Sequence, residues 1–244
     1  MSGKAIKISA TVITLTAFFF TTGFLISKLK VDPNAFGKNK RFAIVSITSL
    51  NKITSNQGQA GVFGAIKAIS KKYSFSSDAR PVVRKMVPIL FQEMAKSRHF
   101  RLITSRSILN SRIYKNTKGA KLKGFMGTKM ITAPGYKYIK SKSGFKKLAK
   151  ELNVDAVMLV HVNYGVATSW IGPVGKNYGT ATVTVLAVDQ NGKSVWSHTV
   201  VEKNKKGRRV FGIGPADFKA IEPAFYEATR AAIRKHLKKL DKKL

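Results

Sequence analysis

The chain has 244 residues, of which 44% are hydrophobic, so it is long enough to bury a sizeable core and too apolar to be disordered throughout. Lys and Arg number 45 against 11 Asp and Glu, and the net charge of +34 favours anionic partners such as nucleic acid, anionic lipid or acidic polysaccharide. The absence of cysteine excludes disulfides, thiolate metal sites, a cysteine nucleophile and the lipid-modified cysteine of a bacterial lipoprotein.

An uncharged run occupies residues 8–27, with lysines on both sides of it. Its length is close to the roughly 20 residues that span a bilayer, and its basic start is typical of a secretory signal. We therefore expect residues 1–30 to be a signal peptide or a membrane anchor. The basic residues that follow the run would keep the body in the cytoplasm. A short amino end before an apolar run is nevertheless the usual export layout, and we favour export.

The body is predicted to be one domain over residues 41–244, preceded by a linker at 31–40 that is rich in Pro, Gly and polar residues. The predicted elements, in chain order, are a strand at 41–48, a helix from Ser77 and Asp78 onward, a strand at 100–104, a helix at 105–114 capped by Ser105, a helix at 143–153, strands at 154–167, 178–188 and 193–202, and a helix over 216–240. A short helix weakened by glycines fits residues 58–73, and Pro88 is expected to kink or split the first long helix.

The last three strands give the clearest pattern. The first half of 154–167 is apolar on both faces, as a central strand requires. Residues 178–188 alternate between small apolar residues and threonines, and Asp189-Gln190-Asn191-Gly192 is a hairpin turn that leads into the next strand. The fold class is therefore α/β (α+β): a single mixed sheet with a C-terminal antiparallel meander, helices packed on it, and an N-terminal apolar helix before it.

Three segments resemble a family of bacterial envelope proteins. They are HFRLITSRSIL (99–109), FKKLAKELNVDAVMLVHVNYGV (145–166) and VTVLAVDQNGKSVWSHTV (183–200). The pattern is similar to that of the curli-secretion pore lipoprotein, the penicillin-binding-protein activator lipoproteins and the amino-terminal domain of the Tol–Pal translocation protein. The resemblance implies a non-enzymatic periplasmic domain that binds other envelope proteins, and it supplies no catalytic residue.

Residues that could carry a reaction are sparse. The four histidines lack metal-ligand spacing, although His161 and His198 lie on predicted strands and could be neighbours there. No G-x-S-x-G motif occurs, and the acidic residues are scattered. Asp155 is expected to form a turn or cap a helix. We therefore expect no enzyme activity, no metal and no cofactor.

The segment 115–150 holds eleven lysines and no acidic residue, and we expect a lysine-rich loop at 115–144. Within it, Gly124-Phe125-Met126-Gly127 has the GxxG spacing of a KH-domain loop, and Tyr136 and Tyr138 could stack on bases. Because lysine supplies a point charge and not a bidentate fork, any nucleic-acid binding would be independent of sequence. A solvated loop without a ligand, an envelope polyanion or membrane surface, and nucleic acid all remain open as interpretations.

Two functional hypotheses follow. The first is a docking, scaffold or activator module of the cell envelope, anchored to the inner membrane or secreted across it, that binds envelope proteins and anionic lipid or cell-wall polymer. The second is a membrane-anchored, cytoplasm-facing protein that binds nucleic acid non-specifically. A homo-oligomer is compatible with both. The residues expected to contact the partner are Lys118, Lys121, Lys123, Lys129, Lys137, Tyr138 and Lys140.

Overall fold

The structure of the chain is a computed structural model that describes residues 29–56, 76–122, 124–125, 128–139, 141–171, 174–211 and 218–244. The apolar run at 8–27 and the short helix expected within 58–73 lie outside the described residues. No helix in the described ranges is long and apolar enough to cross a membrane.

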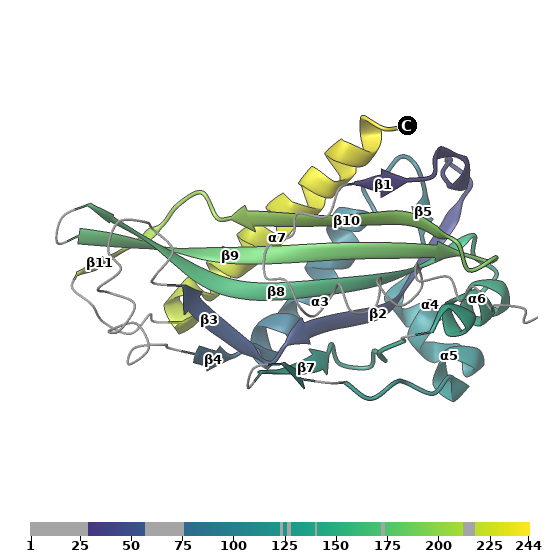
Figure 1. The fold of residues 1–244 in the computed structure, drawn as a ribbon, viewed down its shortest axis with the longest axis horizontal. Coiled ribbons are helices and arrows are strands. Elements are labelled where there is room, and N and C mark those ends of the chain that lie inside the picture. The colour runs from purple at the N-terminus through teal and green to yellow at the C-terminus, as the bar shows by residue number, and fades with distance from the viewer. Residues whose placement is uncertain are drawn as a thin grey trace, which may run out of the picture.

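Strands and helices alternate through the first part of the chain, and three long strands and a helix close it (Figure 1). In chain order, the elements are β1 (Lys30–Val31), the 3-10 helix η1 (Pro33–Ala35), β2 (Arg41–Leu50), β3 (Lys52–Asn56), β4 (Ser76–Asp78), α3 (Arg80–Met94), β5 (Arg101–Leu102), α4 (Ser105–Asn110), α5 (Arg112–Asn116), β6 (Gly124–Phe125), β7 (Thr128–Thr132), α6 (Lys142–Glu151), β8 (Ala156–Ile171), β9 (Val174–Asp189), β10 (Ser194–Lys203), β11 (Arg208–Phe211) and α7 (Phe218–Asp241).

One mixed sheet holds the strands of the described residues, and its main path runs β1-β10-β9-β8-β2-β7-β6. β8, β9 and β10 form the antiparallel meander, and β2 pairs in parallel with β8 and antiparallel with β7. The turn after β9 is made possible by Gly192, whose φ of 80° lies in the left-handed region that favours glycine. The predicted fold class is therefore confirmed, and β1 and β6–β7 are the two opposite edges of this path.

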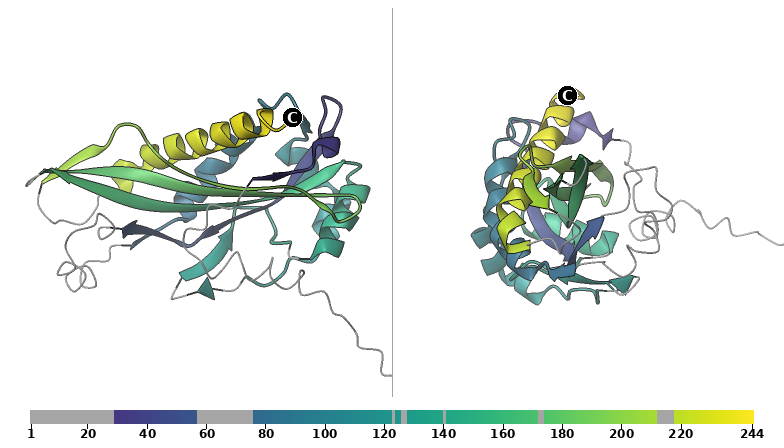
Figure 2. Two further views of the ribbon diagram at one scale, coloured as in Figure 1. Left: turned by 45° about the horizontal axis from the view of Figure 1, so that its top comes forward. Right: turned by 90° about the vertical axis from the view of Figure 1, so that its left-hand side faces the viewer.

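Helices α3 and α7 cover one face of the sheet (Figure 2). α3 buries Val83, Met86 and Leu90, which recur at helical spacing, against α7 and the sheet. α7 lies close to β9 because Gly179 has no side chain: a Cβ there would lie only 2.8 Å from the Cβ of Ala224. Pro88 is on the exposed side of α3, and the helix continues through it, so the predicted split does not occur.

A second, smaller core lies on the other face, where α4, α5 and α6 pack over Ala43, Val45 and Val157. The helix expected at 105–114 is two helices. Thr104, and not Ser105, caps α4. The non-helical backbone of Ser111 ends α4, and its hydroxyl accepts from the Tyr114 N–H to cap α5.

Residues 31–40, where the sequence predicted a linker, are packed into the domain. The Phe36 ring stacks on Phe42 with centroids 5.3 Å apart, and the Asp32 carboxylate accepts from the Lys193 ammonium at 2.5 Å. Leu29, the first described residue, already packs against the main core. The folded domain therefore begins before residue 31.

Candidate polyanion-docking edge

The lysine-rich segment forms the edge of the sheet that is opposite β1. β7 pairs with β2 through Thr48–Thr132, Ser49–Ile131 and Leu50–Met130, and β6 pairs with β7. The Asn51 side chain accepts from the Lys129 N–H at 2.7 Å, which fixes the start of β7. The segment is thus partly a sheet edge, and its described backbone is tied to the domain.

Tyr114 connects this segment to the core. Its side chain is buried, its hydroxyl donates to the carbonyl of Val45 at 2.8 Å, and the same oxygen accepts from the Lys137 N–H at 2.8 Å. Burial raises the pKa of Tyr114 to about 12, so the hydroxyl keeps its hydrogen for Val45 at physiological pH. Sequence reasoning missed this residue.

The Lys137 side chain binds the backbone at the end of α5. Its ammonium donates to the carbonyls of Tyr114 at 3.0 Å, Lys115 at 2.6 Å and Thr117 at 2.7 Å, all at the C-terminal end of α5. The last carbonyls of a helix lack the N–H partners of a further turn, and a cation is favoured beside them. The Tyr114 carbonyl also accepts from the Thr117 N–H at 3.2 Å. Lys137 is therefore committed to holding the segment, and it is not free to contact a partner as the sequence predicted.

The other predicted contact residues divide into three groups. Lys118, Lys121 and Lys129 are exposed. Tyr138 is half-buried against the smaller core, and its carbonyl accepts from the Ala120 N–H at 2.7 Å. Lys123 and Lys140 are outside the described residues. We define the lysine-rich edge as Lys115, Lys118, Lys121 and Lys129, the exposed described lysines on the stretch from the end of α5 to β7.

The two features that suggested nucleic-acid recognition have structural roles. Gly124 and Phe125 form β6, and Phe125 pairs with Thr128 of β7, whereas the KH loop lies between two helices. Tyr136 is 5% exposed and bonds Ser105 through its hydroxyl at 2.7 Å, so its ring cannot stack on a base. The interpretation of Tyr136 as a base-stacking residue was therefore wrong, and Met126 and Gly127 of the GxxG segment lie outside the described residues.

The carboxylates do little to neutralise the lysine-rich edge, because those in ion pairs are bound to basic residues outside this edge. The acidic residues in ion pairs are Asp32, Asp78, Glu93, Glu151, Asp155, Glu202, Glu222 and Asp241. Among the described residues, no carboxylate lies within 4.0 Å of the four edge lysines. Asp155 joins the start of β2 to the sheet by accepting from Lys40 and from the Arg41 N–H. The edge therefore keeps its positive charge.

His198 and His236 form a buried pair that the sequence analysis did not predict. His161 and His198 lie on opposite faces of the sheet, because they pair with the adjacent β9 residues Thr184 and Val185. The neighbour of His198 is His236 on α7, with their Nδ1 atoms 2.8 Å apart. Both side chains are buried, and burial is the main cause that lowers the pKa of His198 to about 4 and that of His236 to about 3.

The described residues hold no group of three or more His, Cys, Asp or Glu side chains that could bind a metal ion. A cavity of about 480 Å³ between α3 and the β5–α4 connection is lined mainly by apolar side chains such as Val87, Phe91 and Leu102, with Arg106 as its charged lining residue. No pair of titratable groups faces this cavity, so it does not form a reaction centre of the acid–base kind.

No protein-family model and no curated protein matches the chain. Among solved structures, the C-terminal domain of LpoB from Salmonella enterica aligns with a TM-score of 0.31 and 10% identity, over 68% of this chain and 83% of that chain. PelC from Paraburkholderia phytofirmans, solved as a dodecamer, aligns with a TM-score of 0.30 and 13% identity, over 86% of this chain and 92% of that chain. The structure is thus distantly similar to both, and at these TM-scores the likeness assigns neither a function nor an assembly state.

Proposed function

We propose that the chain is a non-enzymatic docking module of the bacterial cell envelope. It is exported across the inner membrane, contacts other envelope proteins, and binds anionic cell-wall polymer through its lysine-rich edge. The family resemblance of residues 99–109, 145–166 and 183–200 motivates the location and the protein partners. The positive charge of the lysine-rich edge motivates anionic cell-wall polymer as its ligand.

The observation that carries the proposal is the way the exposed lysines are held. Tyr114 and Lys137 tie the segment to the core by hydrogen bonds of 2.6–3.0 Å, and Asn51 fixes Lys129. The exposed lysines are therefore presented from an ordered backbone, which lowers the entropy lost on binding. Every ion pair among the described residues joins its carboxylate to a basic residue outside the lysine-rich edge.

Sedimentation of the full chain, solubilised in detergent, with purified peptidoglycan sacculi tests the proposal. The triple variant Lys118→Gln, Lys121→Gln, Lys129→Gln removes three edge charges. At about 1 kcal/mol for each basic residue near an anionic surface, affinity should fall on the order of 100-fold. A matched control, Lys176→Gln, Lys205→Gln, Lys219→Gln, removes three exposed charges on other elements: β9, the β10–β11 connection and α7. It should retain most of the binding.

Equal binding by the two triple variants would show that net charge alone is at work and would contradict a docking edge. Double-stranded DNA is the competing ligand, titrated at low salt where phosphate contacts are strongest. Tight DNA binding that depends on the same three lysines, together with no binding to sacculi, would favour the cytoplasm-facing alternative over the envelope module.

A further inference from the structure

The amino-terminal end of the domain leaves almost no slack between the apolar run and the sheet. The run ends at Ser27, Leu29 packs against the main core, and Lys30 is paired with Ser197 of β10. At about 3.3 Å per residue, Ser27 lies within roughly 10 Å of β1 along the chain. A membrane that holds residues 8–27 must therefore lie close to the β1 side of the domain.

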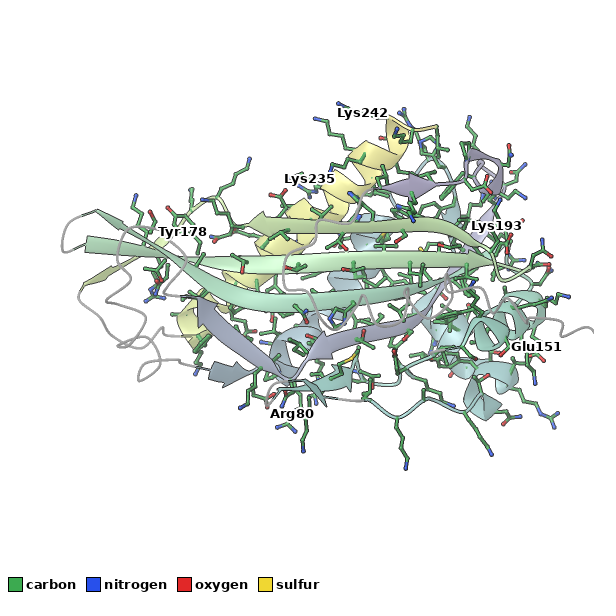
Figure 3. All side chains as sticks on the ribbon, in the orientation of Figure 1. Arg80, Glu151, Tyr178, Lys193, Lys235 and Lys242 are labelled. Atoms are coloured by element: carbon green, nitrogen blue, oxygen red, sulfur yellow. The ribbon has the colours of Figure 1, made fainter. Side chains whose placement is uncertain are left out.

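A second, separate group of basic side chains surrounds β1. The last turns of α7 lie beside β1: Lys239 is 3.4 Å from His198, which follows Ser197 on β10, and Asp241 pairs with His99. We define the β1 edge by its basic residues Lys30, Lys38, Lys239, Lys242 and Lys243. Figure 3 shows Lys235 and Lys242 projecting from α7 on the side where β1 lies, with Arg80 on the opposite side.

The carboxylates beside the β1 edge are already committed. Asp32 is paired with Lys193, Asp241 with His99 and Arg98, and Glu202 with Lys235. Within the described ranges, none of the five lysines of the β1 edge has a carboxylate within 4.0 Å. Leu244, which follows Lys242 and Lys243, is 41% exposed and is the exposed large hydrophobic residue of the described part. A cluster of lysines with an exposed leucine suits an anionic bilayer surface.

We infer that the β1 edge lies against anionic phospholipid, so that the lysine-rich edge faces away from the membrane that holds the chain. The two edges are separated by β10, β9, β8 and β2, which is about 24 Å at ~4.8 Å per strand. With the β1 edge on the membrane, the lysine-rich edge would lie beyond the Debye length of about 8 Å at physiological salt, so the lipid would attract it only weakly. This inference rests on the proposed function for the ligand of the lysine-rich edge, and it assigns the lipid to the other edge.

Because the chain has no cysteine, single-cysteine variants report the orientation without background. Leu244→Cys labels the β1 edge, and Asn116→Cys at the end of α5 labels the side of the lysine-rich edge. Each full-length variant is labelled with an environment-sensitive fluorophore and reconstituted into vesicles of phosphatidylcholine and phosphatidylglycerol that carry a headgroup-attached spin-label quencher. We expect several-fold stronger quenching at residue 244 than at residue 116. Quenching at residue 244 should weaken when Lys239, Lys242 and Lys243 are changed to Gln.

Equal quenching at the two positions, or stronger quenching at residue 116, would overturn the inference. Absence of quenching at both would overturn it too, because the domain would then stand away from the bilayer. The sacculus assay in detergent contains no bilayer, so its result is independent. If quenching is not stronger at residue 244 but the sacculi still bind the protein, only the lipid-facing β1 edge is refuted. If the two triple variants bind sacculi equally well, the proposed function is refuted.

Discussion

Acidification should destabilise the fold through the buried pair His198 and His236. The bond from His236 Nε2 to the carbonyl of Val183, at 3.0 Å, requires that this nitrogen carry the hydrogen. His236 Nδ1 therefore accepts from His198 Nδ1, and His198 Nε2 is left as an acceptor facing the Lys239 ammonium at 3.4 Å. An additional proton on either ring would place two donors against each other, next to a cation.

The sign and size of the effect follow from the pKa shifts. Burial, with the charge of Lys239 adding to it, lowers the folded-state pKa to about 4 for His198 and about 3 for His236, against an unfolded value near 6.5. Below that unfolded value, the unfolded chain binds more protons than the folded chain, so the free energy of unfolding falls as the pH is lowered toward the folded-state values. Between pH 7.5 and 5.5 this amounts to about 1.4 kcal/mol for each ring, or about 3 kcal/mol for the pair.

Urea unfolding followed by tryptophan fluorescence measures this, because the Trp196 ring lies 6.0 Å from the His236 ring. Salt is held constant and high so that general charge repulsion is screened. The variant His198→Asn, His236→Gln keeps hydrogen-bonding amides and removes the titration, while His99 and His161 remain and cancel in the comparison. The pH dependence of the variant should be smaller by about 3 kcal/mol. If the double variant does not fold, His198→Asn alone should remove about half. An unchanged pH dependence would refute the reasoning.

Three further changes test other contacts, each by urea unfolding. Lys137→Met removes the donor to three carbonyls and should lower the free energy of unfolding by about 2 kcal/mol. The control Lys118→Met should change it by no more than about 0.5 kcal/mol. Equal effects of the two variants would contradict a structural role for Lys137. Glu93→Gln should cost about 2 kcal/mol at neutral pH, because the buried carboxylate accepts from Arg234 and Lys96. Hydrogen bonding to Arg234 lowers the pKa of Glu93, so this difference should shrink as the pH falls below the ordinary carboxyl value, and a pH-independent difference would argue against the ion pair. Pro88→Ala should raise stability by about 1–3 kcal/mol because it restores an N–H inside α3, and a decrease would mean that the proline is required there.

Much of the sheet could be predicted from local patterns. The apolar residues around Leu159 identified the strand that became β8, and the alternation that ends at Asp189 identified β9 and its hairpin. β8 extends beyond its predicted C-terminal end and β9 begins before its predicted start, since Thr168 and Gly175 carry no hydrophobic signal and are held by cross-strand pairing. The helix predicted at 143–153 corresponds to α6, because Phe145 and Leu148 recur at helical spacing, and the structure adds Ser141 as its N-cap.

The features that locate the candidate edge depend on contacts distant in sequence. β7 is only five residues long, and its partner β2 lies roughly 80 residues earlier, so its pattern alone could not predict a strand. Nothing in the sequence separates Lys137 from neighbouring lysines, because its role depends on where α5 ends. The burial of His236 did have a signal: it lies between Ile233 and Leu240 on the apolar stripe of α7.

The most direct test of two oppositely placed charged edges is a bridging measurement. Full-length protein reconstituted in phosphatidylglycerol-containing vesicles is mixed with fluorescent soluble peptidoglycan fragments, and the fragments that float with the vesicles are counted. We predict that the native chain captures fragments, and that Lys118→Gln, Lys121→Gln, Lys129→Gln remains on the vesicles while its capture falls on the order of 100-fold. If vesicle binding instead abolishes capture by the native chain, the two ligands share one surface and the account is contradicted.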